Sequence, residues 1–171
     1  MRIVTVFIGL LTVTVIQAQK LYDVKLDDCL LKFEMESLEE WIYYEKNDSL
    51  MVLDFLNGLD EKRVERIRGG IQLQIMVDTI QDICCLSYTN KTNLSDRRLE
   101  VPVRVKQMEG WQRHDGVRPD ENLCALVSIL FEKDKYTVVR TGYDRNRGSQ
   151  ILYSLSYPKY EPDTTAVDNK E

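Results

Sequence analysis

The sequence is poor in histidine, glycine and proline. Its 171 residues hold one histidine, eight glycines and four prolines. A single histidine argues against most metal centres and against hydrolases that use a histidine base. So few glycines and prolines exclude collagen-like and Pro/Gly-rich low-complexity chains. The 43% of hydrophobic and 30% of charged residues favour one folded domain over a disordered chain.

The chain also lacks a basic run and the familiar catalytic motifs. Lys and Arg number 23 against 28 Asp and Glu, a net charge of −5, so we expect no nucleic-acid partner. There is no Gly-x-Ser-x-Gly, no His-Glu-x-x-His and no Gly-rich phosphate loop. His114 stands beside Asp115-Gly116 and is interpreted as an exposed loop residue. We therefore predict no enzyme, no catalytic residue, no metal and no cofactor.

Long hydrophobic runs are missing except at the start. Residues 3–16 are apolar apart from three threonines and a glycine, follow Arg2 and precede the small residue Ala18. This pattern is typical of a secretory signal peptide, and the run is shorter than the ~20 residues that span a bilayer. A membrane anchor is the alternative. We predict a secreted, extracellular protein that does not span the membrane, with a signal peptide over 1–18, one domain over 19–158 and a flexible polar tail over 159–171.

In a secreted protein the cysteines are expected to form disulfides, and some asparagines are expected to carry glycans. The four cysteines are Cys29, Cys84, Cys85 and Cys124. An even set in an oxidising compartment predicts disulfides. A bond between the two adjacent cysteines would need a strained ring, so we expect Cys29 to join one of them and Cys124 the other. Three acceptor tripeptides predict glycosylation in exposed loops, at Asn47, Asn90 and Asn93.

Alternation of apolar and polar residues is the main pattern in the rest of the chain. It is clearest in Ile71–Val77 and in Leu99–Val105, where Pro102 would place the strand at an edge or a bulge. A short helix is predicted over Asp60–Arg68, capped by Asp60 and ended by two glycines. The predicted strands cover 40–46, 71–77, 83–88, 99–105, 107–114, 123–131, 136–143 and 151–157. About eight strands favour a mainly β, antiparallel barrel or sandwich.

A helical alternative exists for the first half of the domain. The periodicity of residues 30–82 also fits two or three helices, which would make a helical bundle of the cytokine type. The last third of the chain is rich in strand-forming residues. This composition favours the β alternative.

Two segments resemble the lipocalin family. Cys29 and the later Glu-Trp-Ile-Tyr-Tyr stretch around Trp41 resemble the first lipocalin strand, where a cysteine precedes a Gly-x-Trp-Tyr sequence. Residues 126–158 resemble the last three strands of the apolipoprotein-D-like branch. The positions that match there are Asp134, Tyr136, Leu155 and Ser156. The chain departs from the family pattern at Glu39, Gly142 and Tyr157, and it is shorter after the last strand.

This resemblance implies an eight-stranded antiparallel up-and-down barrel of the lipocalin or calycin type, with one short helix in the first long loop. It implies transport of a small hydrophobic ligand, such as a lipid, retinoid or sterol, in the barrel cavity. The residues expected to bind the ligand are Trp41, Tyr43, Leu99, Val101, Val103, Val105 and Tyr136. The alternative is a secreted signalling ligand or inhibitor that contacts an extracellular protein partner through an exposed surface over Leu50–Leu59.

Overall fold

The computed structural model describes residues 21–26, 32–114, 120–144 and 146–159. Three predictions concern residues outside these ranges and are not addressed by the structure. They are the signal peptide over 1–18, the bridging role of Cys29, and the tail after residue 159.

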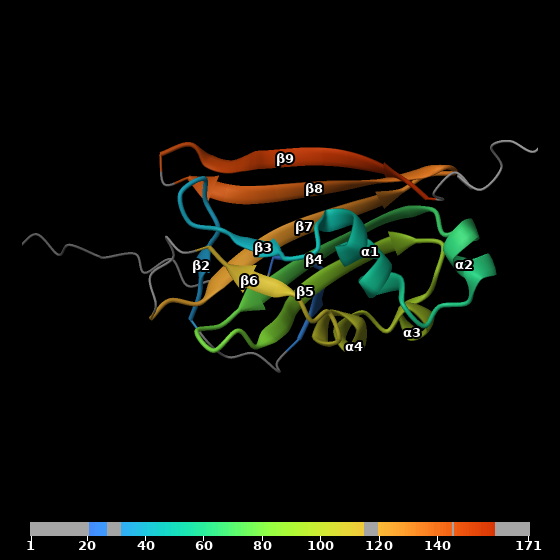
Figure 1. The fold of residues 1–171 in the computed structure, drawn as a ribbon, viewed down its shortest axis with the longest axis horizontal. Coiled ribbons are helices and arrows are strands. Elements are labelled where there is room, and N and C mark those ends of the chain that lie inside the picture. The colour runs from blue at the N-terminus through green and yellow to red at the C-terminus, as the bar shows by residue number, and fades with distance from the viewer. Residues whose placement is uncertain (1–20, 27–31, 115–119, 145, 160–171) are drawn as a thin grey trace, which may run out of the picture.

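A twisted, mainly antiparallel sheet forms most of the described chain (Figure 1). Its strand order is β1-β5-β4-β7-β8-β9, and a short β2 pairs in parallel with the start of β7. The strands are β1 (Val24–Lys25), β2 (Glu34–Met35), β4 (Gly69–Val77), β5 (Ile83–Thr92), β7 (Leu123–Phe131), β8 (Lys135–Asp144) and β9 (Gly148–Pro158). The predicted mainly β, antiparallel class is confirmed.

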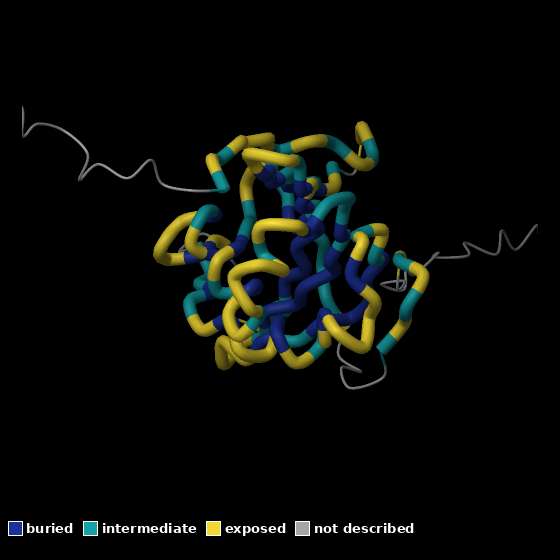
Figure 2. The backbone as a smooth tube through the Cα atoms, turned by 90° about the vertical axis from the view of Figure 1, so that its right-hand side faces the viewer, coloured by how far each residue is buried: buried dark blue, intermediate teal, exposed yellow. Residues whose placement is uncertain are grey.

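A second layer covers one face of this sheet (Figure 1). It contains the antiparallel pair β3 (Ile42–Tyr44) and β6 (Trp111–Arg113) and the helices α1 (Asp48–Leu56) and α4 (Val101–Lys106). Two further short helices are α2 (Glu61–Arg66) and α3 (Asp96–Leu99). Side chains from both layers form one continuous core, which Figure 2 shows as the dark central strands.

The pattern of β4 explains how the core forms. Its inward residues Ile71, Leu73 and Ile75 have no exposed surface, and they pack beneath the second layer. Gln74 lies on the other face, where its side-chain oxygen accepts hydrogen bonds from the Leu21 N–H and the Ser87 hydroxyl. Alternation thus separates the two faces as the sequence predicts, but the second face is also covered, because Gln74 is fully buried and Met76 packs there in a smaller apolar cluster. Burying each of these aliphatic side chains stabilises the fold by about 1.5–3 kcal/mol.

The sheet stays open within the described residues. β1 and β9 end the strand order, each with one neighbour, so the predicted eight-stranded barrel is not confirmed. The up-and-down order holds only for the neighbours β4–β5, β7–β8 and β8–β9, because β7 pairs with β4 and not with the preceding strand β6. The strand expected around Trp41 in the barrel wall corresponds to β3, which begins at the next residue and pairs with β6 in the second layer. None of the helices in the part of the chain that the structure describes is long and apolar enough to cross a bilayer.

The predicted strand over Leu99–Val105 is wrong, because these residues form the end of α3 and most of α4. Val101 and Val105 are one helical turn apart and are fully buried on one face of α4, while Val103 is 53% exposed. Pro102 lies in the first turn of the helix, where a missing N–H costs nothing. An alternating pattern that spans only seven residues fits either structure, and packing against the core decides for the helix.

Side-chain caps mark the start of two other helices, the predicted α2 and the helix α1 in a segment that the sequence left ambiguous. α2 is confirmed, and the Asp60 side chain accepts the Arg63 N–H at its start as expected. Gly69 follows this helix with a φ of 93°, a conformation that glycine adopts without strain. The ambiguous segment Leu50–Leu59 is mostly helical, and the Asn47 side chain caps α1 by accepting the Leu50 N–H.

The cysteines lie on both sides of β4. Met76 pairs with Cys84 in one neighbouring strand and with Cys124 in the other, which places those two cysteines two strand spacings apart, about 9.5 Å. Disulfides need Cα atoms within roughly 4.4–6.8 Å. Cys85 lies in the main core, on the opposite face of the sheet from Cys124. Cys85 and Cys124 are buried free thiols and Cys84 is disulfide-bonded, so the predicted bridge to Cys124 is wrong.

Candidate functional site

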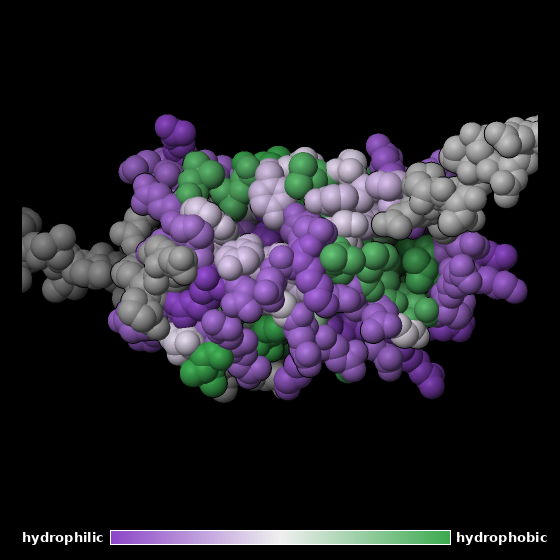
Figure 3. Space-filling view, viewed as in Figure 1, coloured by the Kyte–Doolittle hydropathy of each residue, from purple (hydrophilic) through white to green (hydrophobic). Residues whose placement is uncertain are grey.

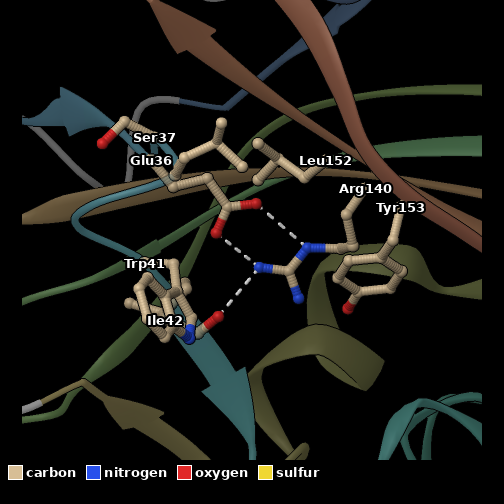
Figure 4. Close-up of a pocket in the computed structure, with 8 residues that line it drawn as sticks. Glu36, Ser37, Trp41, Ile42, Arg140, Leu152 and Tyr153 are labelled. Carbon is tan, nitrogen blue, oxygen red and sulfur yellow. Dashed lines mark hydrogen bonds and ion pairs between the residues drawn. The ribbon is translucent and has the colours of Figure 1, made fainter.

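The most deeply buried charges belong to Glu36 and Arg140, with side chains 0% and 2% exposed. The Arg140 Nε donates to one carboxylate oxygen at 3.0 Å, and Nη2 donates to the other at 2.5 Å (Figure 4). Nη2 also donates to the Ile42 carbonyl oxygen at 3.1 Å. Such a two-pronged pair is stronger and more directional than a single charged hydrogen bond. It ties β8 to the segment that joins β2 to β3.

The backbone of Glu36 is fixed by the sheet itself. Its N–H donates to the Cys124 carbonyl in β7 at 2.9 Å, and its carbonyl accepts the Tyr143 N–H of β8 at 2.7 Å. Gly142 makes this approach feasible, because a Cβ there would lie 2.7 Å from the Glu36 carbonyl oxygen and 2.9 Å from a Leu152 methyl. Glu36 therefore occupies the place beside β7 where the direct β7–β8 pairing has ended.

Two aromatic rings surround the Arg140 guanidinium. Its central carbon lies 5.2 Å from the Trp111 ring centre and 6.0 Å from that of Tyr153. Both rings stabilise the cation through their electron-rich faces. In Figure 4 the remaining nitrogen, Nη1, points away from Glu36. This nitrogen and the Trp111 indole nitrogen are buried without a hydrogen-bond partner among the described residues.

Burial and charge act in opposite directions on this pair. Burial raises the pKa of the Glu36 carboxyl above its usual value, although the Arg140 charge and hydrogen bond act to lower it. Burial acts to lower the pKa of Arg140, but the Glu36 charge outweighs it and the net direction is upward. Burial, with a hydrogen bond to Asp48, raises the pKa of the Tyr153 hydroxyl. Arg140 therefore keeps its charge, and Tyr153 its proton, at physiological pH.

A pocket of about 230 Å³ opens beside the pair. Its lining comprises Glu36, Ser37, Leu38, Trp41, Ile42, Arg140, Leu152 and Tyr153. Figure 4 shows Trp41 and Tyr153 on opposite sides of the ion pair. The Trp41 indole stacks on His114 with ring centres 3.9 Å apart, which holds this side of the pocket in place. His114 lies outside the strands, as its interpretation as a loop residue predicts, but it is half-buried, so the exposure predicted for it is wrong.

The turn that carries Leu38 is held by the Ser37 hydroxyl. Its oxygen accepts the backbone N–H groups of Glu39 and Glu40 at 3.2 and 3.1 Å. The pocket thus has a fixed turn on one side and the hairpin of β8 and β9 on the other. Apolar side chains form the walls of the pocket, and the ion pair of Glu36 and Arg140 forms its polar end. This arrangement can hold a small molecule by burying apolar surface.

The structure brings Trp41 into the pocket and places the other predicted ligand residues elsewhere. Tyr43 is 42% exposed on β3, and Val103 faces solvent on α4. Tyr136 is buried in the core, where its hydroxyl lies 2.7 Å from that of Ser49. The remaining three are fully buried core residues, namely Leu99, Val101 and Val105. Contact of this set with a ligand stays a prediction.

Sequence reasoning missed Glu36, Arg140, Leu152 and Tyr153. Arg140 could have been found from the sequence. It lies an even number of positions from the buried residues Tyr136 and Val138 in β8, so its side chain points to the same face of the sheet. A charge at an inward position of a strand signals a buried partner. The segment around Glu36 has no periodic pattern, so nothing in the sequence identifies that partner.

The glycosylation acceptors are only partly in loops. Asn47 and Asn93 are exposed, but Asn90 lies inside β5, so its assignment to a loop is wrong. Hydrogen bonds from this side chain to Leu94 and Asp96 extend the ordered structure beyond the strand. Glycosylation itself stays a prediction at all three positions.

A group of three carboxylates lies apart from the ion pair. Oxygen atoms of Glu34, Glu40 and Glu121 are within 4.8 Å of one another. Such ligands suit hard cations, but each of these residues already takes part in an interaction, so we assign no metal to them. The candidate site is therefore the pocket built from residues 36–42 and the β8–β9 hairpin.

No family model, no curated protein and no solved structure matches this chain.

Proposed function

We propose that this protein is secreted and binds a small, mainly apolar molecule in the pocket beside Glu36 and Arg140. The observation that carries the proposal is a cavity of about 230 Å³ with apolar and aromatic walls over a fixed ion pair. Removing ~150 Å² of apolar ligand surface from water would contribute roughly 4 kcal/mol. The walls are held by hydrogen bonds and stacking, so little further ordering is needed on binding.

The pocket also constrains the size and polarity of the ligand. Pockets that bury drug-sized molecules measure about 300–1,000 Å³, so this one takes a smaller molecule or one end of a lipid, retinoid or sterol. The carboxylate of Glu36 disfavours an anion. The Arg140 charge is already paired with Glu36, which favours a neutral ligand over a charged one.

A lipocalin-like origin belongs to the same proposal. The Trp41 segment that resembles the first lipocalin strand forms one side of the pocket, and the segment over residues 126–158 supplies the β8–β9 hairpin on the other side. Ligand binding here does not require a closed eight-stranded barrel. Secretion and glycosylation are supported by the leader pattern and acceptor tripeptides of the sequence.

Intrinsic tryptophan fluorescence provides the test. Trp41 lines the pocket and Trp111 lies in the core, so a Trp111→Phe chain reports on the pocket alone. The mature chain is titrated with fatty acids, retinoids, sterols and small neutral aromatic compounds. We expect a saturable fluorescence change with at least one class. No saturable change with any class would overturn the proposal.

A matched pair of variants assigns binding to the pocket. Leu152→Phe fills the cavity, whereas Ile151→Phe makes a similar change at the neighbouring residue, whose side chain is 69% exposed. Binding should weaken at least tenfold in the first variant and stay unchanged in the second. Equal binding by both variants would place the ligand elsewhere.

A further inference from the structure

β9 leaves a long edge of the main sheet without a neighbour. It contains 11 residues, and within the described chain it pairs only with β8. Half of its backbone N–H and C=O groups therefore point away from the sheet. Its exposed apolar side chains include Ile151 at 69%, Leu155 at 48% and Tyr153 at 37%. Figure 3 shows hydrophobic surface along this upper side of the molecule.

This edge lacks the usual protection against pairing. Proteins protect sheet edges with charged residues, with proline or with very short strands. Gly148–Pro158 contains no charged residue, and its single proline is the last residue of the strand. The opposite edge, β1, has only two residues, one of which is Lys25. Of the two edges, β9 alone offers a full-length uncharged template.

We propose that β9 pairs with β9 of a second copy of this chain, antiparallel about a two-fold axis. A two-fold interface places the same strand on both sides. Because β9 is uncharged throughout, it meets itself without charge repulsion in any register, although the chain as a whole carries a net charge of −5. Pairing adds roughly one main-chain hydrogen bond per paired residue and joins two sheets into one.

The sequence of β9 also suits a copy of itself. Ser149, Ser154 and Ser156 can form hydroxyl contacts across an antiparallel pair, as Ser156 does with Thr137 of β8 at 2.8 Å. Ile151 and Leu155 each lose part of their exposed surface when a second strand lies beside them, on opposite faces of the joined sheet. The alternative contact segment Leu50–Leu59 offers less, because most of its apolar side chains are buried in the core.

Analytical ultracentrifugation of the mature chain over a hundredfold range of concentration tests the proposal. The disrupting variant is Ile151→Lys with Leu155→Lys. Its matched control is Ile80→Lys, which changes an 82%-exposed side chain between β4 and β5. We expect the wild type and the control to dimerise and the double variant to dimerise at least tenfold more weakly. A monomer at every concentration, or a dimer that the double variant retains, would overturn the proposal.

Hydrogen exchange on the unmodified chain provides a second measurement that does not depend on variant folding. Dimerisation through β9 should slow exchange at alternate amides of residues 148–158 as concentration rises. Amides of the central strand β4 should not change, because both of its neighbours are already in place. Concentration-independent exchange along β9 would exclude the pairing even if the lysine variants fail to fold.

Discussion

The Arg140 guanidinium is bound by the Glu36 carboxylate in a fully buried two-pronged ion pair. These residues are 104 positions apart, and their contact joins the segment before β3 to β8. Both also line the pocket, and Glu36 is bonded through its backbone to β7 and β8. The same interaction therefore contributes to the stability of the fold and to the shape of the proposed binding site.

Removing one partner of this pair should be costly. Arg140→Met leaves the Glu36 charge buried and unpaired, so we expect a loss of about 3–5 kcal/mol in the free energy of unfolding. Replacing both residues, as in Glu36→Leu with Arg140→Met, should cost less than the single change. Urea unfolding measures all of these values.

An exposed ion pair provides the control for this prediction. Lys135 and Glu132 lie 3.2 Å apart with side chains 52% and 44% exposed. Lys135→Met should change stability by about 0–1 kcal/mol. If Arg140→Met were as mild as Lys135→Met, the buried pair would not have the structural importance that we assign to it.

Gly142 should not tolerate a side chain. An alanine Cβ at this position meets the Glu36 carbonyl oxygen at 2.7 Å, and the backbone there is held by hydrogen bonds. We expect Gly142→Ala to destabilise the protein by about 1–3 kcal/mol. Gly70→Ala is the matched control, because the nearest atom to its Cβ would be 3.8 Å away. Thermal unfolding of both variants measures the difference, and equal melting temperatures would contradict the close packing around Glu36.

The thiol content of the protein should reveal a single disulfide. Cys85 and Cys124 are buried free thiols and Cys84 is bonded, so we expect Cys29 to be its partner. A maleimide should label no cysteine in the native protein, two after unfolding and four after reduction. Mass spectrometry counts the labels. Failure to label the unfolded, unreduced protein would show a second bridge and contradict the strand order around β4.

The buried Cys85 thiol also makes stability depend on pH. Burial raises its pKa from 9.0 to about 12. Because the folded value lies above the unfolded one, this contribution is full below the unfolded pKa and is lost as pH rises toward the folded pKa. The stability of the wild type relative to Cys85→Val should therefore fall as the pH rises from about 9 toward 12. A difference that stays constant over this range would contradict a buried thiol.

Asn90 should be structurally more important than Asn47. The Asn90 amide donates to the Leu94 carbonyl and to Asp96, and its oxygen accepts from the Thr92 N–H and hydroxyl. Asn90→Ala should cost about 1–3 kcal/mol. A glycan on Asn90 would replace one of its two donated hydrogens, whereas the cap made by the Asn47 oxygen remains intact when its nitrogen carries a glycan.

Glycopeptide mass spectrometry of protein from secretory cells tests the glycosylation part of this prediction. We expect higher occupancy at Asn47 than at Asn90. Equal occupancy, with stability unchanged by Asn90→Ala, would contradict a structural role for the Asn90 side chain.

Local patterns predicted β4, β7, β8, β9 and α2 well, because alternation and caps act over a few residues. They misassigned Leu99–Val105 as a strand. Val101 and Val105 are four positions apart, a spacing that puts them on one face of a strand and also on one face of a helix. Local patterns could not predict which strands become neighbours. β7 pairs with β4 because the chain between β5 and β7 places α4 and β6 in the second layer and not in the sheet.

The site was harder to predict than the fold. Trp41 was identified through a resemblance, and it does line the pocket. Arg140 could be recognised from the sequence because it is a charged residue at an inward-facing position of a strand. Glu36, in contrast, is positioned by backbone hydrogen bonds to β7 and β8 at the point where these two strands no longer pair with each other. Such long-range geometry leaves no mark in the local sequence around Glu36.

Nuclear magnetic resonance of the mature protein, labelled with ¹⁵N and titrated with the same compound panel, tests the central claim most directly. We expect saturable shifts at the Trp41 indole, the Arg140 Nε–H and the amides of Leu152 and Tyr153, with little change at the amides of α2, which lies at the other end of the sheet (Figure 1). No saturable shift at these groups with any compound, or shifts confined to other parts of the chain, would contradict binding in this pocket.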